Sequence, residues 1–195
     1  MRNSTNDPKL DRNDPGKSQN QDEQSFANRI IRAGKLDVTL YEEVEHDKTA
    51  TGQAIGVIVL SSLAAGIGNF GIGWMGMGIN AIGAIIGWYI WAYLTYFIGT
   101  RFLAEPQTEA DHGQLLRTIG FASAPGLLRV LGIVPGIRGI VFSLTSIWML
   151  VAMVIAVRQA LDYTSTLRAV GVCLLGWIVQ AIILLGIYFL IGGAA

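Results

Sequence analysis

Two clusters of acidic residues, each containing one of the two histidines, are the first groups in this sequence that could bind a metal ion. The first cluster is Glu42, Glu43, Glu45, His46 and Asp47, and the second is Glu105, Glu109, Asp111 and His112. Carboxylate and imidazole side chains are ligands for several divalent metal ions. Neither cluster has the spacing of a specific metal motif, so we expect solvated acidic segments, no metal site and no cofactor. A metal ion shared between the two clusters is the alternative.

Arg129 is the second candidate, because it lies in the middle of the apolar segment TIGFASAPGLLRVLGIVPGIRGIVF, residues 118–142. A charged side chain inside a membrane is costly, and it marks a functional site unless it reaches the headgroups. We expect the Arg129 side chain to extend to the outer headgroups. The alternative is a polar site within a helical bundle, in which Arg129 pairs with Asn80 or Asn69.

Motifs of known catalytic chemistry, such as GxSxG, HExxH and the P-loop, do not occur in the sequence. Four of the five membrane spans predicted below contain no acidic residue in their cores, although a proton- or ion-coupled transporter usually needs one there. The 14 basic and 14 acidic residues cancel, so the net charge gives no indication of nucleic acid binding. We therefore predict that the protein is not an enzyme and has no nucleic acid partner.

Long uncharged runs dominate the 195-residue chain, which is 52% hydrophobic and only 14% charged. No Asp, Glu, Lys or Arg occurs between Lys48 and Arg101, within residues 139–157, or after Arg168. About 20 apolar residues are needed to cross the hydrocarbon core of a bilayer as a helix. The sequence therefore predicts an all-α, polytopic membrane bundle in the lipid bilayer. Its five transmembrane helices are expected at about 51–68, 79–102, 115–133, 139–157 and 169–191.

Glycine and proline positions add detail to these spans. The glycine-rich stretch 68–80 is expected to form the turn between the first two spans, because glycine weakens helices. Pro125 should kink the third span, with Ser123 close enough to satisfy the freed carbonyls. Gly83 and Gly87 form a GxxxG pair that would let another helix approach the second span closely.

The distribution of basic residues predicts the orientation of the bundle, because cytoplasmic segments are enriched in lysine and arginine. With a cytoplasmic N-terminus and an outside C-terminus, five spans place only Arg129 and Arg138 toward the outside. The cytoplasmic side then holds Arg32, Lys35, Lys48, Arg101, Arg117, Arg158 and Arg168.

The residues before the first span divide into two parts. Residues 1–25 are polar and have too little apolar surface to fold, so we expect a disordered tail. Residues 26–48 are predicted to be a cytoplasmic amphipathic segment next to the membrane, with Arg29, Arg32 and Lys35 facing anionic lipid.

A second short helix is expected within this segment. It should begin near Thr39, whose spacing to Glu42 is that of a capping box. Leu40, Tyr41 and Glu42 are our candidates for contacts with a cytoplasmic partner.

In the order and spacing of its features, residues 26–191 of the chain resemble the Yip1 domain family, bacterial branch. The resemblance is carried by ASAP at residues 122–125, by Trp148, and by the pairs Arg158–Gln159 and Arg168–Ala169. It implies five membrane helices and a cytoplasmic N-terminus. Eukaryotic relatives act in membrane traffic and bind prenylated Rab GTPases, using an Asp-Leu-Tyr-Gly type motif.

Leu40 and Tyr41 are the closest match to that motif, but they lack the preceding Asp and the following Gly, so Rab binding is not expected. We predict a non-enzymatic, multi-pass membrane protein that organises membrane or protein partners, in the cytoplasmic membrane if the source is bacterial. The partner would be a second copy of the chain or another membrane protein. The alternative is a small channel, transporter or lipid-transfer protein that uses a polar spot around Arg129 and Asn80.

Overall fold

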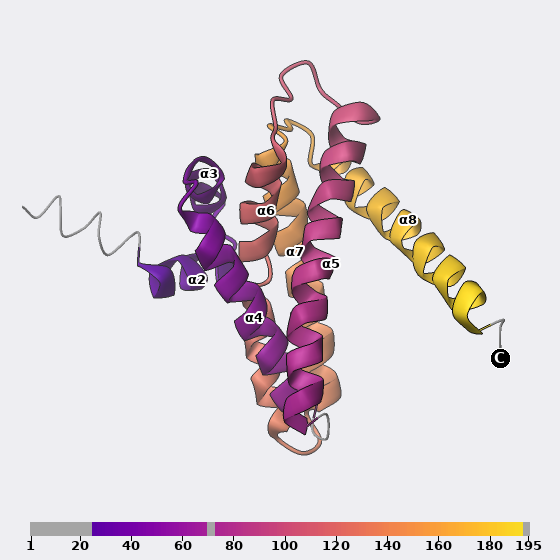
Figure 1. Ribbon diagram of the computed structural model, residues 1–195. Coiled ribbons are helices and arrows are strands. Elements are labelled where there is room, and N and C mark those ends of the chain that lie inside the picture. The colour runs from indigo at the N-terminus through magenta and orange to yellow at the C-terminus, as the bar shows by residue number, and fades with distance from the viewer. Residues whose placement is uncertain (1–24, 70–72, 193–195) are drawn as a thin grey trace, which may run out of the picture.

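The fold is that of a computed structural model that defines residues 25–69 and 73–192. Within these ranges every regular element is helical, so the all-α prediction is confirmed. The helices are α2 (Phe26–Gly34), α3 (Val38–His46), α4 (Ala50–Gly68), α5 (Gly73–Arg101), α6 (His112–Phe121), the 3₁₀-helix η2 (Ala124–Ile133), α7 (Arg138–Ala160) and α8 (Thr166–Gly192) (Figure 1). The predicted tail lies outside these ranges, apart from Ser25, whose side chain caps α2.

Four helices in the described part of the chain are long and apolar enough to cross a membrane, namely α4, α5, α7 and residues 166–183 of α8. The prediction for α5 was wrong at its start, because this helix begins at Gly73 rather than near residue 79. Residues 73–80 are therefore helical, not a turn. In an apolar medium an unpaired backbone group costs several kcal/mol, which outweighs the helix penalty of glycine, about 1 kcal/mol.

The segment predicted as the third span, 115–133, is not one continuous α-helix. α6 ends at Phe121, and after a turn the chain continues as η2. Pro125 lies in the first turn of η2, where its missing N–H removes no helical hydrogen bond. In place of the kink that we expected at Pro125, the structure has a change from α-helix to 3₁₀-helix. Ser123 contributes through its backbone, whose carbonyl accepts a hydrogen bond from the Gly126 N–H at 2.9 Å.

The helices form an elongated bundle with a cap at one end (Figure 1). α4 packs against α5, α6 and η2, while α7 packs against α3, α6, η2 and α8. α6 and η2 follow one another along the bundle (Figure 1). α2 and α3 pack on this assembly by contacts with α6, α7 and η2. We call these two helices the cap. α8 contacts α5 and α7 and then runs away from the bundle (Figure 1).

Small residues bring α4 into close contact with α6 and η2. A β-carbon on Gly120 of α6 would lie only 2.7 Å from the Cβ of Ala54 in α4. Further along, a β-carbon on Gly126 of η2 would overlap the hydroxyl of Ser61. Glycine at these two positions is therefore required by the packing, as in other closely packed membrane helices.

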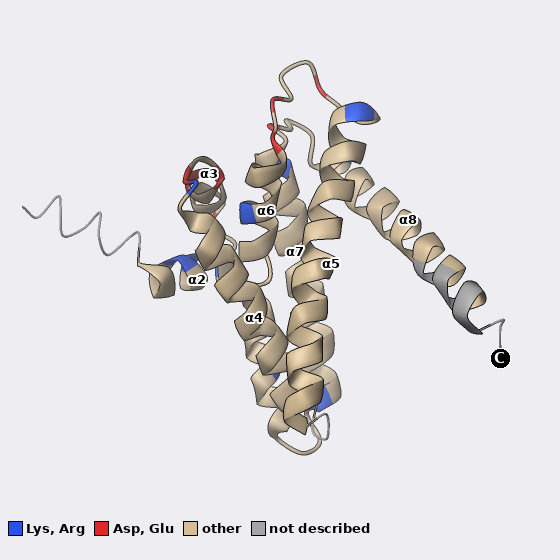
Figure 2. Cartoon of the chain, in the orientation of Figure 1, with Lys and Arg blue, Asp and Glu red and all other residues tan. Residues whose placement is uncertain are grey.

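Charged residues are segregated along the bundle (Figure 2). Every acidic residue in the described ranges lies in α3 or at its two ends (residues 37–47), in residues 102–111 or in residues 161–165. These segments are at the same end of the molecule, which we call the acidic end (Figure 2). The opposite end, which we call the arginine end, carries Arg129 and Arg138 and no carboxylate among the described side chains.

Candidate functional site

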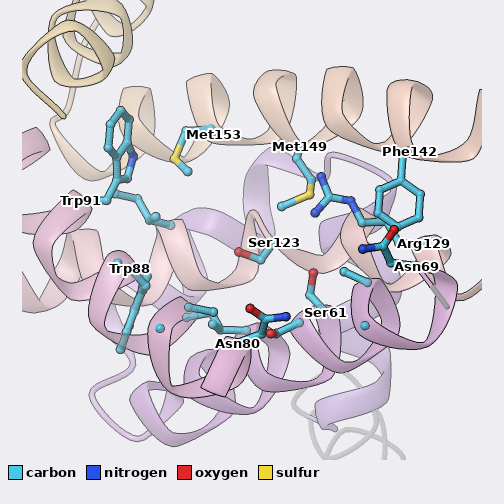
Figure 3. A pocket seen from close by; sticks show the side chains of 18 of the residues that line it. Ser61, Asn69, Asn80, Trp88, Trp91, Ser123, Arg129, Phe142, Met149 and Met153 are labelled. Carbon is cyan, nitrogen blue, oxygen red and sulfur yellow. The ribbon is translucent and has the colours of Figure 1, made fainter. Parts of the chain in front are cut away.

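A cavity of about 710 Å³ lies between α4, α5, η2 and α7, with α8 at one margin (Figure 3). α5 packs against α4, α6 and α8, whereas α7 packs against α3, α6, η2 and α8. The two helices therefore stand on opposite sides of the cavity (Figure 3). Its polar lining consists of Ser61, Ser62, Asn69, Asn80, Ser123, Arg129 and Gln180.

The half-buried guanidinium of Arg129 enters this cavity from η2 and is held by α7. Its Nε donates a hydrogen bond to Thr145 Oγ1 at 3.4 Å, and its Nη2 donates one to Ser146 Oγ at 3.0 Å. The guanidinium carbon lies 5.5 Å from the centre of the Phe142 ring, within the range of a cation–π contact. Among the ion pairs of the described residues, none involves Arg129. The charge of this residue is therefore not neutralised by a carboxylate in that part of the chain.

The structure brings Arg129, Asn69 and Asn80 to one cavity but does not pair them in the way we considered from the sequence. Asn69 Oδ1 accepts a hydrogen bond from Arg138 Nη1 at 3.3 Å. Asn80 lines the cavity from α5. Hydroxyl groups of α7, rather than these amides, hold the Arg129 guanidinium. Ser123 also lines the cavity, directly before η2.

In the described part of the chain, no other helix packs closely against Gly83 and Gly87. No atom outside their own helix lies within 4 Å of a β-carbon built on either residue. Both glycines line the cavity instead. The GxxxG face of α5 thus widens the cavity, and other glycines make the close helix contacts, among them Gly120 and Gly126.

Two aromatic side chains of α5, Trp88 and Trp91, line the part of the cavity away from Arg129 (Figure 3). Trp88 Nε1 donates a hydrogen bond to the Leu116 carbonyl at 2.8 Å, which joins α5 to α6. Trp91 packs beside Trp177 of α8, with ring centroids 6.3 Å apart. The buried Trp91 Nε1 has no acceptor among the described residues. Met149 and Met153 of α7 face the same space (Figure 3).

Arg29 anchors the cap to the bundle. This side chain is only 2% exposed, and it donates hydrogen bonds of 2.8–2.9 Å to Glu43, Asp47 and Gln53. The prediction that Arg29 faces anionic lipid was therefore wrong, because carboxylates of α3 and its C-cap surround it inside the domain. Arg32 likewise pairs with Asp37 and Glu43, whereas Lys35 is exposed.

The three residues considered for partner binding differ in accessibility. Leu40 and Tyr41 are fully buried, so they contribute to the core and cannot meet a partner without unfolding of the cap. Glu42 is exposed and accepts a hydrogen bond from Gln159 of α7 at 2.8 Å. The prediction that the second short helix, α3, begins near Thr39 with a Thr39–Glu42 capping box was wrong in its cap. The N-cap of α3 is Asp37, whose Oδ1 accepts a hydrogen bond from the Thr39 N–H at 3.0 Å.

Arg117 makes a second link between the cap and the bundle. This buried arginine of α6 donates hydrogen bonds to the backbone carbonyls of Val44, at 2.8 Å, and of Glu45. Burial, together with the nearby charges of Asp162 and Glu42, raises the pKa of the Glu45 carboxyl to about 7. Glu45 is therefore a titratable group of the cap near neutral pH.

Glu105 joins the loop after α5 to the start of α8. Its carboxylate accepts hydrogen bonds from the Thr164 N–H at 3.0 Å, the Thr164 hydroxyl at 2.7 Å and the Ser165 N–H at 3.3 Å. These hydrogen bonds to the charged form lower the pKa of Glu105 to about 2. Glu105 thus acts as a structural anchor at the acidic end.

The two histidines have separate surroundings. His46 Nδ1 lies 2.9 Å from the Glu42 carbonyl at the exposed end of α3. The ring of His112 packs edge-on against tyrosines of α5, namely Tyr89, Tyr93 and Tyr96. No group of three or more His, Cys, Asp or Glu side chains in the described ranges is arranged to hold a metal ion.

Comparison with known families identifies the chain. A sequence model of the Yip1 domain matches residues 41–188, which is more than half of the protein. This chain belongs to the Yip1 family. We found no match among curated proteins or among solved structures. The Yip1 family is a membrane-trafficking family and is not known for enzymes.

In this Yip1 domain, several residues in or next to the cavity were not predicted from the sequence. Thr145 and Ser146 hold Arg129, and they are the only adjacent pair of hydroxyl residues in the uncharged run 139–157. That pair was a usable signal. Trp88 and Trp91 gave no such signal, because they lie in an aromatic-rich stretch that also suits the membrane interface.

Proposed function

We propose that this Yip1-family protein is a non-enzymatic, five-crossing membrane protein, with a cytoplasmic N-terminus, that organises membrane or protein partners through its cap. One observation carries the proposal: the cap is not a loose tail but is fixed to the membrane domain by buried arginines on both sides. Arg29 reaches from α2 to α3 and α4, and Arg117 reaches from α6 to the carbonyls of α3. A partner that binds the cap therefore binds a surface with a defined position on the bundle.

Two features support the five crossings. An α-helix rises about 1.5 Å per residue and a 3₁₀-helix about 2.0 Å, so α6 and η2 in tandem cover about 35 Å of a hydrocarbon core of about 30 Å. In this arrangement the acidic end, which also carries Arg117, Arg158 and Arg168, is cytoplasmic. That placement follows the enrichment of basic residues on the cytoplasmic side.

The exposed surface of the cap is suited to contacts with protein. It combines the carboxylate of Glu42 with the apolar side chains of Ile31 and Val38, which are 56% and 43% exposed. Protein interfaces combine apolar groups with a polar rim. The partner would be a second copy of the chain or another membrane protein, and if the source is bacterial the site of action is the cytoplasmic membrane.

The test combines topology with crosslinking in native membranes. Tags at the two termini should report opposite sides, as an odd number of crossings requires. A photoreactive residue at Val38 or Glu42 should form a discrete adduct with one membrane protein or with a second copy. Glu109 is the matched control, because it is exposed at the same end but outside the cap. Equal adducts from Glu109, or none from the cap, would contradict the proposal.

The cavity favours a second candidate function, that of a small channel, transporter or lipid-transfer protein. Its supporting observation is the polar lining around Arg129 and Asn80 inside an otherwise apolar bundle. Reconstitution into liposomes, followed by ion-flux and lipid-scrambling assays, tests this function. Arg129→Ala should abolish any activity found, whereas a flux that survives this substitution would not use the cavity.

A further inference from the structure

We infer that the cavity between α5 and α7 binds an anionic phospholipid, with the lipid phosphate on Arg129. This inference rests on the membrane placement proposed above and adds the chemical class of a ligand. It does not depend on the cap having a partner. The argument uses the charge, the free hydrogen-bond donors and the depth of Arg129, together with the shape of the cavity.

The charge of Arg129 requires an anion that the described residues do not supply. An arginine side chain stays protonated in proteins, and an uncompensated charge within the bilayer is costly. All acidic residues of the described ranges are at the acidic end, while Arg138, the other cation of the arginine end, adds positive potential. A negatively charged ligand is therefore favoured at this end of the cavity.

The unused donors of Arg129 match a phosphate. A guanidinium has five N–H groups, of which the described contacts use one on Nε and one on Nη2. Both N–H groups of Nη1 and one of Nη2 remain for another acceptor. Neighbouring N–H groups on two guanidinium nitrogens can bind two phosphate oxygens side by side, which is the strongest mode of arginine–phosphate contact.

The position and shape of the cavity favour a lipid over a free ion. Arg129 lies five residues before Val134, the C-cap of η2, which corresponds to roughly 10 Å from the turn that closes the arginine end. A headgroup near the membrane surface is thus within reach of its side chain. Gly83 and Gly87 leave room on the α5 side of the cavity. Met149 and Met153 supply an apolar wall on the α7 side (Figure 3). An acyl chain fits this part of the cavity.

Native mass spectrometry and thermal unfolding of the purified full chain in detergent test this inference. The probes are phosphatidylglycerol, diacylglycerol with the same acyl chains, and inorganic phosphate. We expect phosphatidylglycerol to bind with one-to-one stoichiometry and to raise the unfolding temperature. Diacylglycerol and inorganic phosphate should do neither, because each lacks one half of the recognised chemistry.

Two variants and two matched controls locate the site. Arg129→Gln should weaken phosphatidylglycerol binding about tenfold, the usual effect of losing a charged hydrogen bond. Gly87→Leu should weaken it as well, by filling the space for the acyl chain. The controls are Arg101→Gln, an exposed arginine outside the cavity, and Gly78→Leu, an exposed glycine of the same helix that does not line it.

Three results would overturn the inference. The first is equal binding of diacylglycerol, which would leave Arg129 without a role. The second is full protection by inorganic phosphate alone, which would identify a free anion as the ligand. The third is a loss of affinity in the controls as large as in the two cavity variants. Failure of the crosslinking test for the cap would leave these binding results unchanged, so the two proposals can fail separately.

Discussion

Gly120 of α6 lies against Ala54 of α4 so closely that a β-carbon at position 120 would be 2.7 Å from the alanine methyl carbon and 3.2 Å from its Cα. Both residues are buried. The helices cannot keep this separation if either side chain grows, because the contact involves backbone atoms as well as side chains.

We therefore expect Gly120→Ala to lower the free energy of unfolding by about 1–3 kcal/mol, the typical cost of overpacking a close contact. Thermal unfolding in detergent measures the effect. Ala54→Gly in the same chain should restore part of the loss, since it removes the opposing methyl group. Gly83→Ala is the control, because nothing outside the helix lies within 4 Å of its β-carbon. An equal loss in that control would mean that the effect is not one of packing.

Removal of the Arg29 side chain should release the cap. Arg29→Met removes the cation that pairs with Asp47 and leaves Glu43 paired with Arg32 alone. Because the carboxylates of Glu43 and Asp47 are 29% and 26% exposed, we expect a cost of roughly 2 kcal/mol, below that of a fully buried pair. Trypsin should then cleave after Lys48 faster than in the wild type. Arg101→Gln, an exposed arginine at the same end, should leave the cleavage rate unchanged.

Protonation of Glu45 should make stability depend on pH. Its pKa in the folded chain is about 7, against an ordinary value of 4.5, so between these values the folded state holds the proton more tightly than the unfolded state. Stability should therefore fall as the pH rises from about 4.5 to about 7, and then level off. The expected loss is roughly 2 kcal/mol, allowing for solvent screening.

Glu45→Gln should flatten this part of the stability profile and raise the unfolding temperature at pH 8. Unfolding temperatures across the pH range measure the change. Glu109→Gln, which removes an exposed carboxylate, should retain the slope. A slope that persists unchanged in Glu45→Gln would assign the titration to another group.

The Glu105 anchor should hold the start of α8. Glu105→Gln weakens the acceptors of the Thr164 and Ser165 N–H groups, so amide hydrogen exchange at these two residues should rise several-fold. With its folded pKa lowered to about 2, the stabilising contribution of Glu105 is present above pH 4.5 and is lost between about 4.5 and 2. Unchanged exchange in the variant would mean that other contacts fix this turn.

The helical class of the protein was predictable because uncharged runs of this length have few other structures available. The change from α6 to η2 was harder to foresee. A 3₁₀-helix has three residues per turn, so Gly126, Arg129 and Gly132 lie in line. That spacing is visible in the sequence, but only the packing of Gly126 on Ser61 shows why a thin helix is needed there.

The surroundings of the arginines could not be read from the sequence. Arg29 and Lys35 are both cations of the same amphipathic segment, yet Arg29 is buried and Lys35 is exposed. Their difference depends on the carboxylate of Asp47 and the amide of Gln53, which reach Arg29 only after α3 and α4 fold back on α2. The local sequence pattern predicts that the segment is amphipathic, but the tertiary fold decides which of its charged side chains is buried.

The segregation of charge along the bundle means that the two leaflets are not equivalent for this protein. In the membrane placement proposed above, one leaflet meets charged side chains of both signs, whereas the charged groups that the other leaflet meets are, among the described residues, all guanidinium groups. Moving acidic headgroups from one monolayer to the other, at constant total lipid content, should therefore change how firmly the folded chain is held. The protein is expected to respond to transbilayer lipid asymmetry, a property of the membrane that bulk composition does not report.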